Sequence, residues 1–285
     1  MVRAEAALEP GLTSDSAYPT ISAPDPVYPC QTLSALGVQL AGIATPAMWS
    51  RLEAPLQRAL DELWLRLGLL RRCCPQRWVT LHYGRIALNA HGWERLRAYF
   101  GGVDPDPTLV EPIASGLQGV PERFERLRVG LSRRRLRKRL RRAEQIAARG
   151  LSRVAARNPG ELDTAELARG PLDDRIWVEI LLPELGLLLA GEEQGRGDPR
   201  LRAGIALEQR HATELGRRLI ASGVLQMPTD VAYLTVPERI QAVHDSSDYW
   251  ARRVSSRLQR VDSFVDVDLP ERFWGRPRVE LEETG

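Results

Sequence analysis

The chain has 285 residues, of which 43% are hydrophobic and 27% charged, and its formal net charge is +3. This is ordinary globular composition with enough chain to bury a core, and the small net charge excludes a strong overall field. Three cysteines, two of them adjacent, favour neither a disulfide framework nor a metal site. The most apolar run, residues 180–190, is too short to span a membrane, so we expect a cytoplasmic protein without membrane insertion.

The first part of the chain predicts an arm, a helix and a hairpin. Residues 1–26 are rich in Pro, Ser, Ala and Asp, which is typical of a flexible arm. Residues 47–67 carry leucines at steps of three and four and end before Gly68, so they predict an amphipathic helix. Residues 77–89 alternate on either side of a turn at 83–85 and predict a β-hairpin.

The middle of the chain predicts helices separated by loops. Residues 93–100 predict a short helix, and residues 121–156 a long and very basic one. An internal loop is expected near residues 157–172, where an Asn-Pro-Gly sequence interrupts the pattern. The apolar stretch 176–189 predicts a buried helix that Pro183 kinks or divides.

A further helix with clear end signals follows a loop at residues 191–199. Asp198 is expected to cap it, and Pro199 suits its first turn. Gly223 suits the left-handed residue that follows a helix end. These signals predict a long helix between Pro199 and Gly223.

The C-terminal part predicts a short extended segment and two more helices. Residues 231–234 are expected to be extended, and Thr235 with Glu238 forms a capping-box pattern that opens a helix. A last amphipathic helix is expected from about Ser247. The fold class predicted is mainly α with a few short β-strands (α+β).

Three motifs occur in a fixed order along the chain. They are Gly-x-x-Thr-Pro at Gly42, Thr45 and Pro46; Gly-Arg-x-x-x-Asn at Gly84, Arg85 and Asn89; and Gly-x-Leu then Asp-Val-x-x-Leu-Thr-x-x-Glu at Gly223, Leu225, Asp230, Val231, Leu234, Thr235 and Glu238. Together they resemble the middle domain of phosphoenolpyruvate-utilising enzymes, the family of phosphoenolpyruvate synthase and rifampin phosphotransferase. The resemblance covers residues 27–278 and leaves a C-terminal tail, residues 279–285, outside it.

The resemblance implies a divided reaction. In this family an ATP-grasp domain phosphorylates a histidine on a swivelling domain, and that histidine carries the phosphoryl group to an acceptor. None of the four histidines here stands in the glycine-rich setting of the carrier histidine, and no glycine-rich phosphate loop is present. We therefore expect no cofactor on this chain. ATP and Mg²⁺ are implied only for ATP-grasp and phosphohistidine domains supplied by separate chains.

The resemblance also nominates residues for binding an acceptor of unknown identity. These substrate-binding candidates are Thr45, Arg85, Asn89, Asp230 and Tyr233. For Arg85 and Asn89 the alternative is turn chemistry beside Gly84. An Asp before a short extended segment more often caps the local backbone, and that interpretation is favoured for Asp230.

The largest basic feature lies in the predicted helix 121–156. Its candidate docking residues are Arg133, Arg134, Arg135, Arg137, Lys138 and Arg141. One interpretation is a solvated face with Leu131, Leu136 and Leu140 inward; the other is a surface that binds anions or a partner. Nucleic acid could be bound through contacts to its backbone. However, neither aromatic residues between the cations nor a known reader motif supports sequence recognition, so nucleic acid is not the expected partner.

Glu208 and His211 have the Glu-x-x-His spacing of di-iron bundles. Such a site requires two further glutamates and a second Glu-x-x-His copy, and the sequence has no second copy, so a surface or helix-packing role is favoured.

Two main hypotheses follow from the sequence. The first is an acceptor-binding or scaffold subunit of a split ATP-dependent phosphotransferase that is not catalytic alone. The alternative is a non-enzymatic adaptor that docks a partner through the arginine-rich helix. A degenerate remnant without activity is the third.

Overall fold

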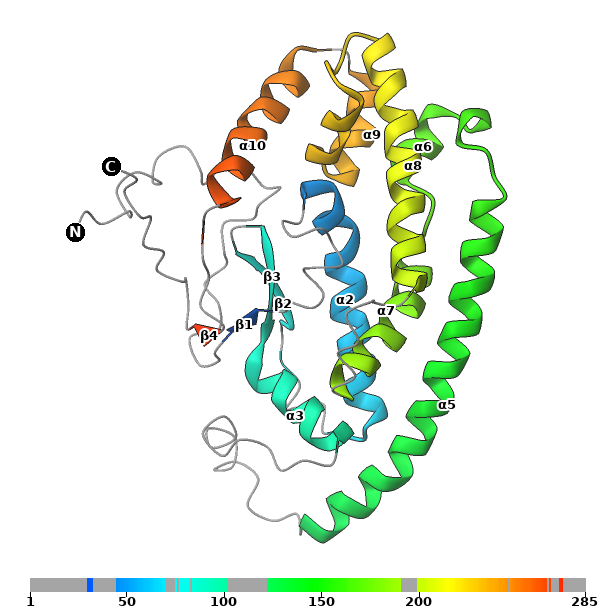
Figure 1. Ribbon diagram of the computed structural model, residues 1–285, viewed down its shortest axis with the longest axis vertical. Coiled ribbons are helices and arrows are strands. Elements are labelled where there is room, and N and C mark those ends of the chain that lie inside the picture. The colour runs from blue at the N-terminus through cyan, green and yellow to red at the C-terminus, as the bar shows by residue number, and fades with distance from the viewer. Residues whose placement is uncertain are drawn as a thin grey trace, which may run out of the picture.

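Figure 1 shows the fold as a computed structural model, which describes residues 30–32, 45–69, 75, 77–82, 84–101, 122–190, 199–245, 247–265, 267 and 272–273. Side chains are described for these residues except 30–32, 91, 101, 122–133, 265 and 272–273. The expected arm, the C-terminal tail and the residues 191–198 of the expected loop lie outside the described residues.

Long helices form the body of the molecule. They are α2 (Pro46–Arg66), α5 (Glu122–Ala155), α7 (Asp174–Leu189) and α8 (Pro199–Ala221). In Figure 1, α7 lies between α2 and α5, and it packs against both. All of these helices were predicted from the sequence to within a few residues, and the prediction of a mainly α fold with a few short strands is confirmed.

Helix α2 supplies the central stripe of the core. Thr45 caps its start, since the Oγ1 atom accepts a hydrogen bond from the Met48 amide at 3.3 Å. Its leucine stripe is at most 1% exposed; the members are Leu52, Leu56, Leu60 and Leu63. Full burial of such a side chain stabilises the fold by about 1.5–3 kcal/mol. Gly68, with a φ of 77°, then turns the chain out of the helix.

Helix α7 continues through Pro183, so the expectation that this residue divides the helix was wrong. A proline in a helix interior costs about 3 kcal/mol. Burial around α7 offsets that cost, since Ile180, Leu181, Leu182 and Leu185 are completely buried. At Gly186 an added Cβ would lie 2.8 Å from the Leu140 Cδ1 atom, so α5 and α7 approach closely there.

The strands form a small antiparallel sheet of order β2-β3-β1-β4. Its members are β1 (Cys30–Thr32), β2 (Val79–His82), β3 (Arg85–Asn89) and β4 (Arg272–Phe273). The predicted hairpin is β2-β3, with Val79 opposite Leu88 and Gly84 turning at a φ of 70°. Helix α3 (Ala90–Gly101) follows β3 directly, three residues earlier than predicted.

A second group of short helices packs at one end of the body. It comprises η2 (Pro159–Glu161), α6 (Thr164–Arg169), η3 (Pro228–Tyr233), α9 (Val236–His244) and α10 (Tyr249–Val265). A separate hydrophobic cluster holds this group together, with Leu167, Leu215 and Leu234 completely buried. Figure 1 shows α9 and α10 at the end of α8, next to the start of α2.

Two sequence expectations in this group need correction. The expected loop near residues 157–172 contains the helical segments η2 and α6, because Asn158 caps the first and an Asp163–Glu166 capping box opens the second. The segment 231–234 was expected to be extended, but residues up to Tyr233 belong to the 3₁₀ helix η3.

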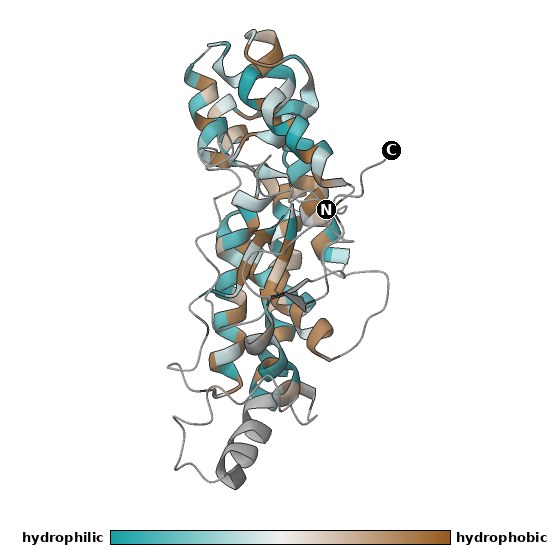
Figure 2. Ribbon diagram, turned by 90° about the vertical axis from the view of Figure 1, so that its left-hand side faces the viewer, coloured by the Kyte–Doolittle hydropathy of each residue, from teal (hydrophilic) through white to brown (hydrophobic). Residues whose placement is uncertain are grey.

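The hydropathy of the chain follows this arrangement. Figure 2 shows hydrophobic residues along the middle of the long body and hydrophilic residues alternating with them on the helices. Within the described part of the chain, no helix combines the length and the apolar character that crossing a membrane requires.

Candidate functional site

Two cavities lie where the helical body meets the group of short helices. The larger, about 410 Å³ and called here the Glu238 pocket, is lined among others by Ser50, Glu238, Gln241, Tyr249, Trp250 and Arg253. The smaller, about 220 Å³ and called the His211 pocket, is lined among others by Val154, Arg157, Glu166, Arg169, Gly170 and His211. Pockets for drug-sized molecules measure about 300–1,000 Å³, so only the first has that size.

Helices α2 and α9 meet at the Glu238 pocket. The Ser50 Oγ atom on α2 accepts a hydrogen bond from the Val236 amide at 3.1 Å, although the two residues are far apart in the sequence. The predicted capping box of α9 is confirmed: the Glu238 amide donates to Thr235 Oγ1 at 3.4 Å, and Glu238 Oε2 accepts from the Thr235 amide at 2.8 Å. This local geometry fixes Glu238 on the first turn of α9.

Glu238 is the anchor of a network with two arginines of α10. Its carboxylate accepts from Arg253 Nε at 2.6 Å and from Arg257 Nη1 and Nη2 at 2.6 and 2.8 Å. Arg257 is completely buried, and its Nη1 atom also donates to the Tyr233 carbonyl. Burial raises the pKa of Glu238, but hydrogen bonds from Arg257 and Thr235 outweigh it, so the pKa lies below its ordinary value.

The outer wall of the Glu238 pocket is aromatic and cationic. Arg253 Nη1 donates to the Tyr249 hydroxyl at 2.6 Å, and the guanidinium lies 5.5 Å from the centre of the Tyr249 ring. The rings of Tyr249 and Trp250 pack edge to face with their centres 4.9 Å apart. With the exposed Gln241, this wall places two aromatic rings beside hydroxyl and amide groups.

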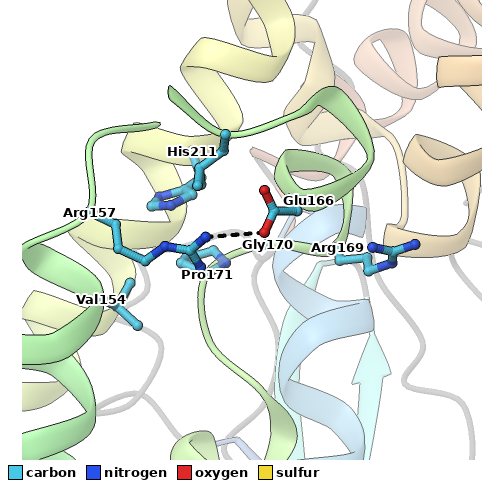
Figure 3. Close-up of a pocket in the computed structure, with 8 residues that line it drawn as sticks. Val154, Arg157, Glu166, Arg169, Gly170, Pro171 and His211 are labelled. Atoms are coloured by element: carbon cyan, nitrogen blue, oxygen red, sulfur yellow. Dashed lines mark hydrogen bonds and ion pairs between the residues drawn. The ribbon is translucent and has the colours of Figure 1, made fainter. Parts of the chain in front are cut away.

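The His211 pocket brings together three polar side chains from separate elements. Figure 3 shows Arg157 from the end of α5, Glu166 from α6 and His211 from α8 around one space, with the Arg169 guanidinium pointing away from them. Arg157 Nη2 and Glu166 Oε1 form an ion pair at 3.1 Å. Both of these side chains are about half exposed, whereas His211 is only 2% exposed.

A buried ionic group lies behind the floor of the His211 pocket. Glu208 on α8 pairs with Arg51 Nε on α2 at 3.2 Å, and Arg51 also donates to the Arg169 carbonyl. Arg239 on α9 is buried nearby. Burial raises the pKa of Glu208, against the effect of the two arginines. Burial lowers the pKa of Arg239 to about 10, so this arginine remains charged at neutral pH.

Three of the predicted acceptor-binding residues cap backbone and do not line either of the two pockets described above. Thr45 caps α2, as described above, and Asn89 Oδ1 accepts from the Gly92 amide at 2.9 Å at the start of α3. Asp230 is 8% exposed, and its Oδ2 atom accepts from the Met227 amide at 2.8 Å and the Gln226 amide at 3.3 Å. The favoured interpretation of Asp230 as a backbone cap is confirmed.

The other two predicted acceptor-binding residues lie in different places. Arg85 begins β3 opposite His82, and Asn89 ends the same strand. Tyr233 ends η3, and its carbonyl oxygen accepts a hydrogen bond from Arg257. Burial raises the pKa of the Tyr233 hydroxyl, and the nearby charges of Asp262 and Asp230 raise it further. The five candidates therefore do not form one site.

The basic helix has an outer and an inner face. Arg134, Arg135, Arg137, Lys138 and Arg141 are exposed, while Leu136 is completely buried and Leu140 partly so. The side chains of Arg133 and Leu131 lie outside the described residues. Arg139 turns inward and pairs with Glu62 at 2.7 Å and with Glu179. Burial lowers its pKa, but the hydrogen bonds that Arg139 donates to both carboxylates outweigh burial and raise the pKa.

Sequence reasoning missed Arg157, Glu166, Arg253 and Arg257. It considered Glu208 and His211 only as half of a di-iron motif, with a surface or helix-packing role as the favoured interpretation. Both residues are buried, so the helix-packing part of that interpretation is confirmed and the surface part is wrong. Within the described residues, no three His, Cys, Asp or Glu side chains lie close enough to hold a metal ion. For Glu208 the sequence did contain a signal of a buried charge, because this residue falls on the apolar stripe of α8 with Leu201, Ile205 and Leu215.

Comparison with known proteins identifies no relative of this chain. No family model matches the chain, and neither a curated protein nor a solved structure matches it. The geometry of the two pockets therefore carries the functional argument.

Proposed function

We propose that this chain is the acceptor-binding subunit of a divided, ATP-dependent phosphotransferase, with the Glu238 pocket as the acceptor site. The observation that supports this most is a convergence. Two of the three segments that resemble phosphoenolpyruvate-utilising enzymes, around Thr45 and around Thr235, meet at this pocket through Ser50 and Val236. Chemistry on ATP is assigned to ATP-grasp and phosphohistidine domains on other chains.

The lining suggests which acceptor the pocket takes. The Glu238 carboxylate is already engaged by two arginines and Thr235, so it positions the wall and is not free to bind a cation. Tyr249 and Trp250 present ring faces or edges, and Gln241 an exposed amide. Such walls bind flat or ring-shaped molecules that carry hydroxyl groups. We therefore expect an uncharged or weakly charged hydroxyl compound with a ring.

Retention of small molecules tests this proposal. The immobilised protein is incubated with the metabolite extract of its native cell, and the bound compounds are identified by mass spectrometry. We expect one hydroxylated compound to be retained by the wild type and lost in the double variant Gln241→Ala/Tyr249→Ala. Arg252→Ala, on the exposed face of α10 beside the pocket, is the matched control and should retain the compound.

The catalytic division has its own test. The retained compound is incubated with ATP and Mg²⁺, either with the pure chain or with proteins co-purified from the native cell. Phosphorylation should require a co-purified ATP-grasp or phosphohistidine protein. Phosphorylation by the pure chain alone, or equal retention by the double variant, would contradict the proposal.

The exposed face of α5 favours a second candidate function, an adaptor for an acidic protein partner. Five cations lie together on this face, while Arg139 faces inward with its two glutamates; the five are Arg134, Arg135, Arg137, Lys138 and Arg141. Because guanidinium groups pair with carboxylates in a forked geometry, an acidic helix or loop fits this surface.

Charge reversal tests the adaptor. The triple variant Arg134→Glu/Lys138→Glu/Arg141→Glu should lose a salt-sensitive partner that the wild type retains in a pull-down. Arg175→Glu/Arg202→Glu changes two exposed arginines outside α5 and should retain it. If the retained material is removed by nuclease, or if both variants behave alike, the acidic-protein adaptor is wrong.

A further inference from the structure

His211 has one nitrogen committed to the backbone and one facing the His211 pocket. Its Nδ1 atom lies 2.9 Å from the Leu207 carbonyl oxygen, one turn earlier on α8. A carbonyl only accepts hydrogen bonds, so Nδ1 must carry a proton. Among the described residues Nε2 has no partner, and it is not one of the nitrogens sealed from solvent. In the neutral ring Nε2 is therefore a hydrogen-bond acceptor at the pocket.

Burial, together with two neighbouring arginines, keeps the His211 ring neutral. The charged groups around the ring are Arg157 just after the end of α5, Glu166 on α6, and Arg210 and Glu208 on α8. Burial lowers the pKa of His211 below its ordinary value of 6.5, and the positive charges of Arg210 and Arg157 lower it further, against the backbone hydrogen bond. At neutral pH the imidazole therefore offers a lone pair and no second proton.

Arg157 and Glu166 determine which other hydrogen-bonding groups a ligand of this pocket must carry. Arg157 can only donate hydrogen bonds, and its guanidinium suits the paired oxygens of an oxyanion. Glu166, like His211 Nε2, can only accept while it is ionised. The pocket of about 220 Å³ is too small for a drug-sized molecule but has room for a tetrahedral anion with a few waters. A matching ligand carries both negative oxygens and a proton.

We propose that the His211 pocket binds a small oxyanion that still bears an acidic proton, with inorganic phosphate as its simplest member. The anionic oxygens pair with the Arg157 guanidinium. The P–OH group donates to His211 Nε2, and a second P–OH, in the singly charged form, donates to Glu166. This site is separate from the Glu238 pocket and goes beyond the acceptor binding proposed above.

Sulfate gives a sharp contrast, because it has the same shape as phosphate but carries no proton at pH 7. Its oxygens would face the lone pair of His211 Nε2 and the carboxylate of Glu166 without a hydrogen to share. Acceptors that face an anionic oxygen without a hydrogen to share penalise the wrong ligand. The site should therefore bind phosphate at least tenfold more tightly than sulfate.

Nuclear magnetic resonance of the imidazole rings tests this in the full chain, which has four histidines. Phosphate or sulfate is titrated at pH 7 and constant ionic strength, and the signal missing in His211→Asn identifies His211. The asparagine amide can keep the bond to the Leu207 carbonyl while removing Nε2. We expect a saturable shift of the His211 signal with phosphate and at least a tenfold weaker effect with sulfate.

Matched variants locate the site. Arg157→Gln should weaken phosphate binding at least tenfold, while Arg153→Gln, one turn earlier on the exposed face of α5, should leave it unchanged. Glu166→Gln supplies a donor and should reduce the preference over sulfate. Unmoved signals of the other three histidines show that a variant is folded. A shift that does not saturate, equal binding of sulfate, or full binding by Arg157→Gln would overturn the proposal.

The two proposals fail separately. Arg157→Gln lies outside the Glu238 pocket and should retain the acceptor, whereas Gln241→Ala/Tyr249→Ala should still bind phosphate. If the wild type lacks one of the two binding activities, or if a variant at one pocket abolishes binding at the other, the result identifies which proposal is wrong.

Discussion

Glu238 and Glu208 are both buried on helices beside two arginines, yet their pKa values move in opposite directions. Glu238 accepts hydrogen bonds from Arg253, Arg257 and the Thr235 backbone. Glu208 is paired with Arg51, while the Nε atom of its second neighbour Arg239 donates to the Val231 carbonyl at 3.2 Å. At Glu208, the charges of the two arginines and the smaller effects of hydrogen bonds from Trp177 and Leu172 do not offset burial. The comparison teaches that arginines offset the burial of a carboxylate when their guanidinium groups hydrogen-bond to it directly, as at Glu238.

Replacing each glutamate with glutamine tests this difference most strongly. Glu238→Gln leaves the buried Arg257 without its counter-charge, so we expect the free energy of unfolding to fall by about 3–5 kcal/mol. Glu208→Gln removes a carboxylate whose charged form is already disfavoured, and we expect a smaller loss of about 1–3 kcal/mol. Urea unfolding measures both. As a control, Asp174→Asn breaks an exposed ion pair with Arg58 and should change the free energy of unfolding by less than about 1 kcal/mol.

If Glu208→Gln is at least as destabilising as Glu238→Gln, hydrogen bonding is not what separates the two sites. The comparison would then have to rest on depth of burial alone.

Gly170 tests how tightly the Arg51–Glu208 pair is confined. Gly170 and Gly223 share a φ of 77°, which strains any other residue. An added Cβ at Gly170 would press on Arg51 and lie 2.9 Å from Glu208 Oε2, whereas at Gly223 it would meet nothing within 4 Å. Gly170→Ala should therefore lower the free energy of unfolding by about 1–3 kcal/mol more than Gly223→Ala. Equal losses in thermal or urea unfolding would show that the ionic group accommodates the methyl.

The pH dependence of stability should have opposite signs at the two glutamates. The folded pKa of Glu238 lies below the ordinary 4.5, so its contribution is complete above pH 4.5 and is lost as the pH falls through the folded value. The folded pKa of Glu208 lies above 4.5, so its contribution is complete below pH 4.5 and is lost as the pH rises through the folded value.

Unfolding of both variants across this range measures the effect. From pH 4.5 upward, the stability of the wild type relative to Glu208→Gln should decline, by at most about 1.4 kcal/mol per pH unit. Below pH 4.5, Glu238→Gln should lose less stability than the wild type. If the free energy of unfolding depends on pH in the same way in the wild type and in Glu208→Gln, the contrast between the two carboxylates is wrong.

Asp230 gives the smallest effect and separates capping from ligand binding. Asp230→Ala should cost about 1 kcal/mol, because the Met227 and Gln226 amides lose their acceptor. Asp230→Asn keeps an acceptor oxygen and should restore most of that stability. Neither change should alter retention of the acceptor compound, and a loss of retention in Asp230→Asn would return this residue to the binding site.

The sequence was sufficient to predict features whose interacting residues lie close together in the chain. The leucine stripe of α2, the hairpin around Gly84 and the Thr235–Glu238 capping box each depend on neighbours a few residues apart. Segment 231–234 misled because its apolar residues suggest an extended strand. The deciding contact is the Asp230 carboxylate on the Met227 amide, which bends the backbone into a 3₁₀ turn.

The site depended on partners that only the fold brings together. Arg257 reaches Glu238 from the next helix, and Arg157, Glu166 and His211 come from three separate elements. Local pattern gave no reason to join them. A polar residue on an apolar stripe, as at Glu208, marks an interior charge but does not name its partner.

Glu238 and Arg239, which are adjacent in the sequence, prevent helix α9 from rotating about its own axis. Successive side chains on a helix point about 100° apart. One of this pair is held by α10, and the other is buried beside α2 and α8. The helix is thereby held at two angles around its own axis and cannot roll without breaking one anchor. A one-residue insertion between Thr235 and Glu238 would turn both side chains away from their partners together, so we expect length changes to be tolerated only outside this turn.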